Sequence, residues 1–246
     1  MCTLIALWRV VGGHDIVVGM NRDESSMRPA DAPLFAEGPP PIVAPRDRKA
    51  GGTWIGASGN GLVAALSNRR GRDSESARSR GLLVLEALQQ PTLPAVDLYL
   101  RREVAAREYN FWNLLVASRQ EMRFFRYDGQ VSMGRGQEGL NVLTNEGANV
   151  DADPKVRSVH ELLAKAPYRS IGDALRALQI ALRHHGEGGT ASLCLHGMGG
   201  GTVSSTILAL NNADPSENIL LYADGAPCSN PFRDYGEVIR HLPSPG

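Results

Sequence analysis

The chain begins with MCTLIALWRV VGGHDIVVGM NRDE, residues 1–24, and this stretch decides the fold that we expect. Two runs, Thr3–Val11 and Ile16–Met20, are rich in β-branched and apolar residues and predict strands. Between them lies Gly12-Gly13, and a glycine pair flanked by two such runs is typical of a tight hairpin turn. The N-terminus therefore predicts two antiparallel strands joined by a two-residue turn.

The expected hairpin brings Cys2 close to polar residues on the second strand. In a two-residue turn Val11 faces His14, and the same register places Cys2 level with Asp23. A three-residue turn shifts this pairing by one position. In either register the Cys2 thiol lies beside an amide, a guanidinium and two carboxylates, all in the segment Asn21–Glu24.

Position 2 gives Cys2 a possible chemical role. Methionine aminopeptidases remove Met1 when the next residue is small, and removal leaves Cys2 with a free α-amino group. Such an amine has an ordinary pKa near 7.7–8.0, where a general base is effective at neutral pH. One residue then supplies both a nucleophilic thiol and its base, and the nearby Arg22 favours the thiolate. The alternative is that Cys2 is an ordinary small residue without catalytic meaning.

Composition limits the classes of protein. The chain has 246 residues, 42% of them hydrophobic, and its 26 basic residues balance 26 acidic ones. Zero net charge argues against a general nucleic-acid-binding protein, and no apolar run approaches the roughly 18 residues of a membrane span. The first residues lack the features of a secretory signal, so we expect a cytoplasmic protein with a single domain over residues 1–246. Three cysteines do not suggest a disulfide framework, and nothing in the composition indicates an oligomeric state.

The order of the expected elements favours an α+β fold. Strands, helices, strands, helices and strands follow one another, which is not the regular alternation of a parallel α/β protein. This order suits antiparallel sheets with helices packed outside them. The expected strands are 3–11, 16–20, 53–57, 62–66, 111–117, 122–127, 140–144, 191–195, 202–210 and 218–222, and the expected helices are 81–89, 95–109, 156–164 and 171–184.

Two further segments have simple structural interpretations. Ala36–Pro45 contains four prolines, and we expect it to be a surface loop. Met198–Thr202 is rich in glycine but precedes a strand instead of a helix. A phosphate-binding loop needs a helix N-terminus after it, so we expect a hairpin connection here.

Two clusters of reactive or charged side chains are ambiguous. The histidines and the cysteine between 184 and 196 do not have the spacing of zinc ligands, so we expect no metal. The arginines that follow Asn68 form either a solvated loop or a rim that binds an anionic ligand, because guanidinium groups bind carboxylate and phosphate with paired hydrogen bonds. The two clusters are His184, His185, Cys194 and His196, and Arg69, Arg70, Arg72, Arg78 and Arg80.

Motifs over nearly the whole chain resemble those of the NRDE family, also called the transport and Golgi organisation protein 2 family. The initial Met-Cys, the Asn-Arg-Asp-Glu segment at 21–24 and the Gly-Gly-Thr-Trp segment at 51–54 occur in the order of that family. NRDE alone is a weak match of four letters, but the three together are specific. The other matching segments are Arg28-Pro29, Ile55-Gly56, Gly61–Asn68, Ser79–Gly81, Tyr109–Leu115 and Val142–Asn145.

The NRDE family resembles the N-terminal nucleophile hydrolases, which implies a four-layer αββα sandwich with antiparallel sheets. Within that superfamily, the chain is most similar to the bile-salt hydrolase and penicillin V acylase group. The resemblance implies that Cys2 is the nucleophile, that Asn21 and Asp23 match the Asn and Asp after the first hairpin, and that Asp23 holds the amine and thiol. It implies that Asn68 and Asn145 donate to the oxyanion, each amide donor contributing on the order of 2.7–4 kcal/mol.

Two arginines of the related proteins are missing from their places. Met20 stands directly before Asn21, where the hydrolases have arginine, and Val203 replaces the arginine of a late Gly-Thr-Arg segment. Arg22 is expected on the same strand face as Met20 and supplies a charge from there, so we add it to the catalytic set. Trp54 is either a core residue or a wall of the pocket. The candidate substrate-binding residues are Asn21, Glu24, Arg28, Trp54 and Arg69.

Two functions from different classes are therefore open. The first is a cysteine amidohydrolase or thioesterase that uses Cys2 on an acylated small molecule and needs no cofactor. The second is a non-enzymatic binding protein, because the resemblance implies Golgi organisation and secretion in eukaryotic members, and haem trafficking and acyl-lipid homeostasis more widely. The missing arginines favour binding, whereas the retained Cys2, Asp23, Asn68 and Asn145 favour catalysis. The expected partner is an acylated compound or haem, whose iron a cysteine can ligate.

Overall fold

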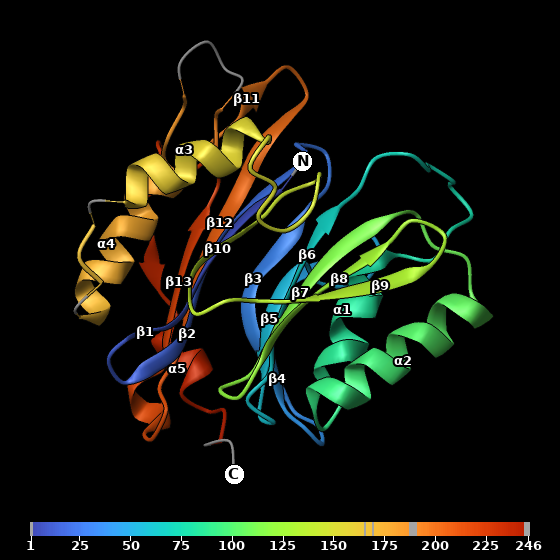
Figure 1. The fold of residues 1–246 in the computed structure, drawn as a ribbon, viewed down its shortest axis with the longest axis horizontal. Helices are drawn as coiled ribbons and strands as arrows, with labels where there is room; N and C mark the ends of the chain where they lie inside the picture. Colours follow the sequence, from blue (N-terminus) through green and yellow to red (C-terminus); the bar gives the residue numbers. More distant parts are fainter. Residues whose placement is uncertain (1, 165, 169, 187–190, 244–246) are drawn as a thin grey trace.

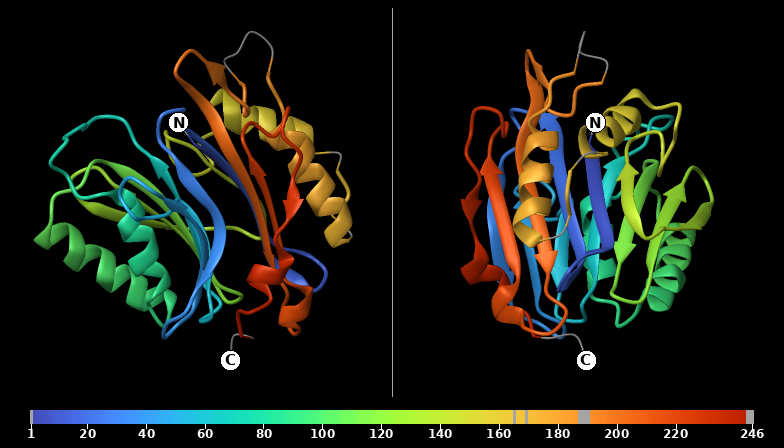
Figure 2. Two further views of the ribbon diagram at one scale, coloured as in Figure 1. Left: turned by 180° about the vertical axis from the view of Figure 1, so that it is seen from behind. Right: turned by 60° about the vertical axis from the view of Figure 1, so that its left-hand side comes forward.

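The molecule consists of four layers, with two β-sheets face to face and helices outside each of them. The structure is a computed structural model that describes residues 2–164, 166–168, 170–186 and 191–243. Figure 1 shows α1 and α2 outside one sheet and α3 and α4 outside the other, and Figure 2 shows the same order of layers from behind. The predicted α+β architecture, a four-layer αββα sandwich of antiparallel sheets, is confirmed.

The first sheet is built around the N-terminal hairpin. Its strand order is β10-β1-β2-β12-β13-β14, with β11 paired to β12, and the neighbouring strands are antiparallel. The strands are β1 (Thr3–Val11), β2 (His14–Ser25), β10 (Gly139–Leu143), β11 (His196–Gly197), β12 (Gly200–Leu210), β13 (Ile219–Asp224) and β14 (Arg233–Asp234).

The second sheet is a meander in which every strand pairs with the next one along the chain. Its order is β3-β4-β5-β6-β7-β8-β9, again antiparallel. The strands are β3 (Ala30–Ala36), β4 (Ile42–Asp47), β5 (Ile55–Ser58), β6 (Val63–Asn68), β7 (Trp112–Ala117), β8 (Met122–Tyr127) and β9 (Val131–Arg135).

The helices cover the outer faces of the sheets. Those of the second sheet are α1 (Arg80–Leu88) and α2 (Leu93–Ala106), and those of the first are α3 (Pro154–Leu163) and α4 (Ile171–Leu182). The short α5 (Gly236–Ile239) follows β14, and the 3₁₀ turn η1 (Pro215–Glu217) follows β12. None of the described helices has the length and apolar character needed to cross a membrane.

Alternation along the N-terminal hairpin decides which side chains lie between the sheets. On β1, Leu4, Ala6 and Trp8 pack into the layer between the sheets, whereas Ile5 and Leu7 pack under α3 and α4. Both faces of this strand are therefore buried, which explains its nearly continuous apolar sequence. Because side chains alternate with period two, Cys2 belongs to the same inner face as Leu4.

The hairpin turn is confirmed, but the register differs by one residue at the site. Val11 pairs with His14 as expected, whereas Thr3 pairs with Asn21. The register shifts between Trp8 and Val11, where Arg9 has a φ of 57°. This irregularity is typical of a β-bulge, so continuing the register places Cys2 opposite Arg22, one residue short of Asp23.

Two predicted segments are wrong. Residues 42–45 belong to β4 and not to a surface loop, and Ile42, Val43 and Ala44 are buried. Residues 191–195 are not a strand, because the backbone N–H groups of Leu193 and Cys194 donate to the carbonyl of His184, just after α4, instead of to a neighbouring strand. The predicted hairpin connection near 198 is confirmed as the β11–β12 turn.

Candidate active site

Cys2 links the two sheets at the start of β1. Its backbone carbonyl accepts a 3.2 Å hydrogen bond from the Ser67 hydroxyl on β6, and its thiol lies 4.0 Å from the carbonyl oxygen of Asp23 on β2. Only 7% of Cys2 is exposed. The predicted removal of Met1 concerns a residue that lies outside the described part of the chain.

A cavity of about 430 Å³ opens over Cys2. Its wall is unusually rich in charge, with guanidinium groups and carboxylates facing the same space and one indole beside them. Residues from β2, β4, β6 and the start of α1 build it, so segments far apart in the sequence contribute. The lining includes Cys2, Arg22, Asp23, Glu24, Arg28, Asp47, Trp54, Asn68 and Arg80.

Asp23 is a buried carboxylate with polar neighbours. Thr202 on β12 donates a 2.6 Å hydrogen bond to Asp23 Oδ1, and Lys155 Nζ on α3 lies 3.9 Å from Asp23 Oδ2. Burial raises the pKa of Asp23 to about 6, although the Thr202 hydrogen bond and the Lys155 charge act in the opposite direction. The group is therefore mainly ionised at neutral pH and mainly protonated below pH 6.

The Cys2 thiol is not activated by its surroundings alone. Burial raises its pKa, and the neighbouring carboxylate of Asp23 raises it further. A thiol of this kind is mainly protonated at neutral pH, so it needs a base in direct contact before it acts as a nucleophile. Arg22 does not reverse this effect, contrary to the expectation that it favours the thiolate.

Arg22 lies on the inner face of β2 and stacks on Trp54. The guanidinium carbon lies 4.3 Å from the centroid of the indole ring, and Arg22 Nη1 donates to the carbonyl of Arg28 at 3.3 Å. Met20 is fully buried between the sheets, so both side chains occupy the same strand face, as expected. Arg22 thus brings into the cavity a charge that Met20 lacks.

An ion pair fixes the far wall of the cavity. Arg28 Nη2 lies 2.7 Å from Asp47 Oδ2 on β4, and Arg28 Nη1 lies 3.4 Å from Glu24 Oε2. Burial is the largest single influence on the pKa of Asp47 and raises it, but the hydrogen bond and charge of Arg28, with smaller contributions from Lys49 and Arg22, together outweigh burial and lower the pKa. Arg28 and Glu24, which we expected to bind substrate, both line the cavity, and Arg28 is also paired with the Asp47 carboxylate.

Asn68 and Asn145 lie together at the edge of the site. The side-chain amide of Asn145 donates to the backbone carbonyl of Asn68. Asn113 on β7 holds this loop, because its amide donates to the carbonyls of Thr144 and Asn145 at 3.0 and 3.1 Å. Asn68 lines the cavity over Cys2, whereas Asn145 lines a neighbouring hollow with Lys155.

Asn21 and Arg69 are absent from the cavity lining. Asn21 faces α4, where its amide donates to the carbonyls of Leu182 and Leu193 at 2.8 Å each. Arg69 turns toward the carbonyl of Glu146. Neither side chain therefore contacts the cavity, because hydrogen bonds hold Asn21 against the end of α4 and Arg69 against the backbone of Glu146.

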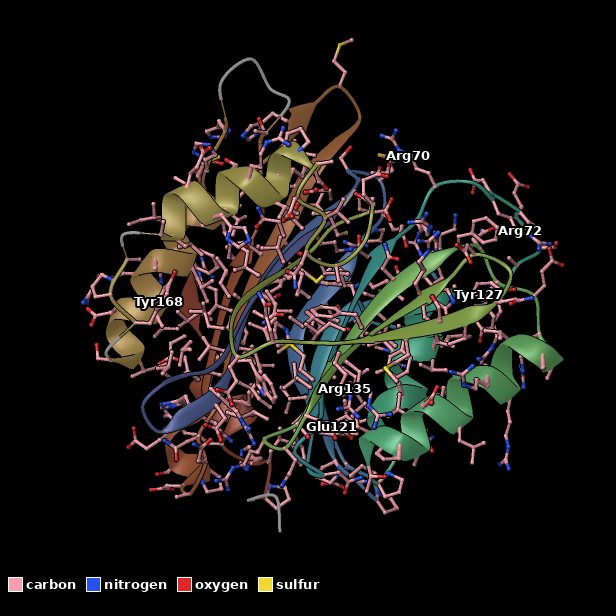
Figure 3. All side chains as sticks on the ribbon, in the orientation of Figure 1. Arg70, Arg72, Glu121, Tyr127, Arg135 and Tyr168 are labelled. Atoms are coloured by element: carbon pink, nitrogen blue, oxygen red, sulfur yellow. The ribbon has the colours of Figure 1, made fainter. Side chains whose placement is uncertain are left out.

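Some arginines of the cluster after Asn68 lie in a solvated loop, and others line the cavity. Figure 3 shows Arg70 and Arg72 extending from the loop after β6, and Arg72 pairs with Glu108 in solvent. Arg80, at the start of α1, lines the cavity and donates to the carbonyl of Phe111 at 3.1 Å. Arg78 pairs with Glu86 and also belongs to the wall.

Sequence reasoning missed three residues that shape the site. Thr202 and Lys155 are the partners of Asp23, and Asn113 positions the Asn145 loop. Lys155 is one of only three lysines in the chain, which is the one signal that could have drawn attention to it. Asn113 and Thr202 lie in segments that the family comparison singled out, but their contacts with Asn145 and Asp23 follow only from the tertiary structure.

The layers define the class of this protein as one with the N-terminal nucleophile hydrolase fold. An N-acylethanolamine-hydrolyzing acid amidase ortholog from Caenorhabditis elegans superposes with a TM-score of 0.59 and 12% identity, covering 98% of each chain. Penicillin V acylase from Agrobacterium tumefaciens superposes with a TM-score of 0.55 and 11% identity, covering 91% of this chain and 83% of that one. At such low identity the likeness shows the fold.

The chain belongs to the Transport and Golgi organisation 2 family, whose model matches residues 1–182. A Transport and Golgi organization protein 2 homolog from Bos taurus is 36% identical over 110 residues. The aligned segment covers 42% of this chain and 39% of the bovine protein, so the match spans about two fifths of that relative. The resemblance inferred from the NRDE and GGTW segments is therefore confirmed.

Proposed function

We propose that this protein is an N-terminal cysteine hydrolase that cleaves an amide or thioester bond of an acylated small molecule. The observation that carries the proposal is the position of the Cys2 thiol on the wall of a charged cavity, with Asp23 directly beside it. The amidase and acylase with the same fold are named for cleaving acyl groups from nitrogen, which supports the same type of reaction here.

The proposed reaction begins after removal of Met1. The free amine of Cys2 accepts the thiol proton, and the thiolate attacks the acyl carbonyl to form a C–S bond. The resulting ammonium returns the proton to the leaving amine or thiol as the tetrahedral intermediate collapses to an acyl-enzyme. Water, deprotonated by the same amine, then attacks the acyl-enzyme and releases the carboxylic acid and the thiol. Asp23, ionised above pH 6, stabilises the ammonium.

Asn68 and Asn145 are the proposed oxyanion donors. An amide nitrogen carries two N–H groups, so Asn145 retains one donor after its bond to the Asn68 carbonyl. The hydrogen bonds from Asn113 limit the movement of this loop, and such preorganisation is what makes a donor effective in a transition state.

The guanidinium groups of the cavity wall, which lie beside its carboxylates, suit a substrate with an anionic group. Arg22, Arg28 and Arg80 face the space, and guanidinium groups suit carboxylates and phosphates. A volume of about 430 Å³ is in the usual range for a small-molecule site. A long alkyl chain would remove these charged groups from water without giving them a new polar partner, so we expect a short or polar acyl portion.

A binding protein without catalysis is the second candidate. The buried Met20 and the replacement Val203 stand where related proteins carry arginine, which favours loss of the chemistry with retention of the pocket. In this alternative the ligand is haem or an acyl thioester, and the same arginines bind its carboxylates or phosphates.

The deciding experiment combines mass spectrometry with kinetics. Intact mass of the purified protein reports whether Met1 is present, and incubation with an electrophilic acyl probe followed by peptide mapping reports whether Cys2 is acylated. Hydrolysis is then measured on a panel of acyl amides and acyl thioesters, with haem and ligand affinity measured on the same samples. The Cys2→Ala variant, treated in the same way, serves as the reference for labelling at other sites.

The proposal predicts that Cys2→Ala loses turnover by several orders of magnitude and retains ligand affinity, because only the covalent route is removed. Turnover that persists in this variant excludes Cys2 as the nucleophile. A different result would favour the binding function over the catalytic one. In that case the parent protein, with Met1 removed, shows no turnover, and an Arg80→Met variant binds the ligand more weakly than the parent does.

A further inference from the structure

A second cluster of reactive side chains lies outside the cavity and plays no part in the proposed hydrolysis. It joins the segment after α4, the segment before β11 and the loop between β13 and β14. Its members are His185, Cys194, His196 and Cys228, whose ligand atoms all lie within 4.8 Å of one another. Four side chains that are spread over more than 40 positions of the sequence thus lie within a few ångströms of one another.

We propose that these four side chains form a structural zinc site. Cys194 and Cys228 are free thiols with their sulfur atoms 3.6 Å apart. The Nε2 atom of His196 lies 3.2 Å from Cys228 Sγ and 3.9 Å from Cys194 Sγ. The His185 ring completes the group, with its centroid 5.1 Å from that of His196.

These separations match the edges of a zinc tetrahedron. With Zn–S near 2.3 Å and Zn–N near 2.1 Å, two sulfurs lie about 3.8 Å apart and a sulfur and a nitrogen about 3.6 Å apart. The observed 3.6, 3.2 and 3.9 Å lie within a few tenths of an ångström of those values. The ligand atom of the exposed His185 lies within 4.8 Å of the other three, so this side chain is the fourth ligand that we assign.

The set of donors selects the ion. Two thiolates and two imidazoles are typical of structural Zn²⁺ sites, which have four protein ligands and no open position, whereas carboxylate and carbonyl sites suit harder ions. The cluster contains no carboxylate. A disulfide between Cys194 and Cys228 is the competing use of these thiols, and it leaves both imidazoles without a role.

The proposed ion would stiffen the strand connection that supports Asp23. Cys194 is followed by Leu195, whose backbone N–H donates to the Thr202 hydroxyl at 2.9 Å. Thr202 in turn donates to Asp23. A metal that fixes Cys194 and His196 therefore holds the partner of the Asp23 carboxylate, while contributing no ligand to the cavity over Cys2.

The spacing explains why sequence reasoning expected no metal. Zinc ligands are usually found as two close pairs, C-x₂₋₄-C and H-x₃₋₅-H. Here His185 is separated from Cys194 by a loop, and Cys228 comes only after β12 and β13. Cys228 reaches the other three ligands only when the chain folds, so the usual zinc-binding pattern is not present in the linear sequence.

The test is metal binding by the full chain. The reduced protein is equilibrated with Zn²⁺, dialysed against metal-free buffer and analysed for zinc by elemental mass spectrometry. A parallel sample is titrated with Co²⁺, which reports a tetrahedral thiolate site through its thiolate-to-metal charge-transfer band and its intense visible bands. We expect one Zn²⁺ per chain and a Tm that rises with added zinc.

Two ligand variants and one matched control make the result specific. Cys228→Ser and His196→Asn should each weaken zinc binding by more than about 100-fold, since even partners outside the ligand shell change affinity by about 10–100-fold. His184→Asn removes the adjacent histidine, which is not in the cluster, and should leave zinc and Co²⁺ binding unchanged. His196 and Cys228 are exposed, so these variants preserve the core.

Three outcomes overturn the proposal. The first is less than one tenth of an equivalent of zinc in the reduced parent protein after saturation and dialysis. The second is equal binding by the parent and both ligand variants, which places the ion elsewhere. The third is a disulfide between Cys194 and Cys228 in the freshly purified protein, seen as a mass decrease of two hydrogens, together with no zinc binding after this disulfide is reduced. None of these depends on hydrolysis.

Discussion

Thr202 on β12 and Asp23 on β2 are directly paired in the first sheet, and the threonine hydroxyl donates a 2.6 Å hydrogen bond to the Asp23 carboxylate. The register of the two strands shifts immediately after this pair, between Thr202 and Ser204. A strand irregularity therefore lies where a buried carboxylate meets its donor, and irregularities of this kind often re-aim a side chain near a functional site.

Removing this donor should raise the pKa of Asp23 above its present value of about 6. Thr202→Val keeps the shape of the side chain and deletes the hydroxyl, so the ionised carboxylate loses a hydrogen bond that favours it. The titration of the Asp23 carboxyl carbon, followed by NMR and assigned with Asp23→Asn, should move to higher pH. Thr206→Val on the same strand is the control, because its hydroxyl has no hydrogen-bond partner among the described residues. If Asp23 titrates at the same pH in Thr202→Val as in the parent, the Thr202 hydroxyl does not lower the pKa of Asp23.

Burial of Asp23 should make part of the stability depend on pH. Its native pKa of about 6 lies above the ordinary value of 3.8, so between these values the folded chain holds a proton that the unfolded chain has lost. The contribution of Asp23 to stability therefore falls as pH rises from about 4 to about 6, by roughly 2–3 kcal/mol, and is constant above that window.

The free energy of unfolding in urea, measured from pH 4 to pH 8, checks this sign. The difference between Asp23→Asn and the parent protein should grow in favour of the variant as pH rises and should level off above pH 6 to 7. A difference that is independent of pH would mean that the Asp23 carboxyl titrates alike in the folded and unfolded chains.

The ion pair between Arg28 and Asp47 should contribute to stability as well as to the cavity wall. Arg28→Met leaves the buried Asp47 carboxylate without its guanidinium partner and should cost about 1–3 kcal/mol. Asp47→Asn in addition should recover part of the loss, because the unpaired charge is gone. The native pKa of Asp47 is lowered, so the stabilisation is present above its ordinary value of 3.8 and is lost below it. Urea unfolding of the four proteins of the cycle at pH 3 and pH 7 measures both effects.

Asn21 should be a structural residue and not a ligand contact. Asn21→Ala removes the donor of two buried carbonyls, those of Leu182 and Leu193, and should lower the free energy of unfolding by about 2–3 kcal/mol. Labelling of Cys2 and affinity for the ligand should not change below the unfolding transition. Asn60→Ala, which removes an exposed hydrogen bond to the Gln90 carbonyl, should cost less than about 0.5 kcal/mol. A selective loss of ligand affinity in Asn21→Ala would return Asn21 to the binding site.

Much of the site was predictable because it lies on local sequence. Cys2 and Asp23 come together through one hairpin, and the Gly12-Gly13 turn that joins its strands is visible in the sequence. The residue-level register was not visible, because the bulge at Arg9 has no clear sequence signal. Asn68 and Asn145 were predictable only through resemblance to a family, since neither periodicity nor spacing joins the end of β6 to a loop so distant along the chain.

The sequence by itself determined most of the longer strands and the four long helices, because alternation, helical periodicity and glycine turns are short-range properties of the chain; β3, β4 and β9 were not predicted from it. It also determined the family, through motifs that lie in order along it. Only the tertiary structure decided that Thr202 and Lys155 meet Asp23, that Asn21 turns away from the cavity, and that Cys228 joins His185, Cys194 and His196. The physical reason is that strand pairing and sheet packing set these contacts, and both depend on the whole core folding together rather than on any one segment.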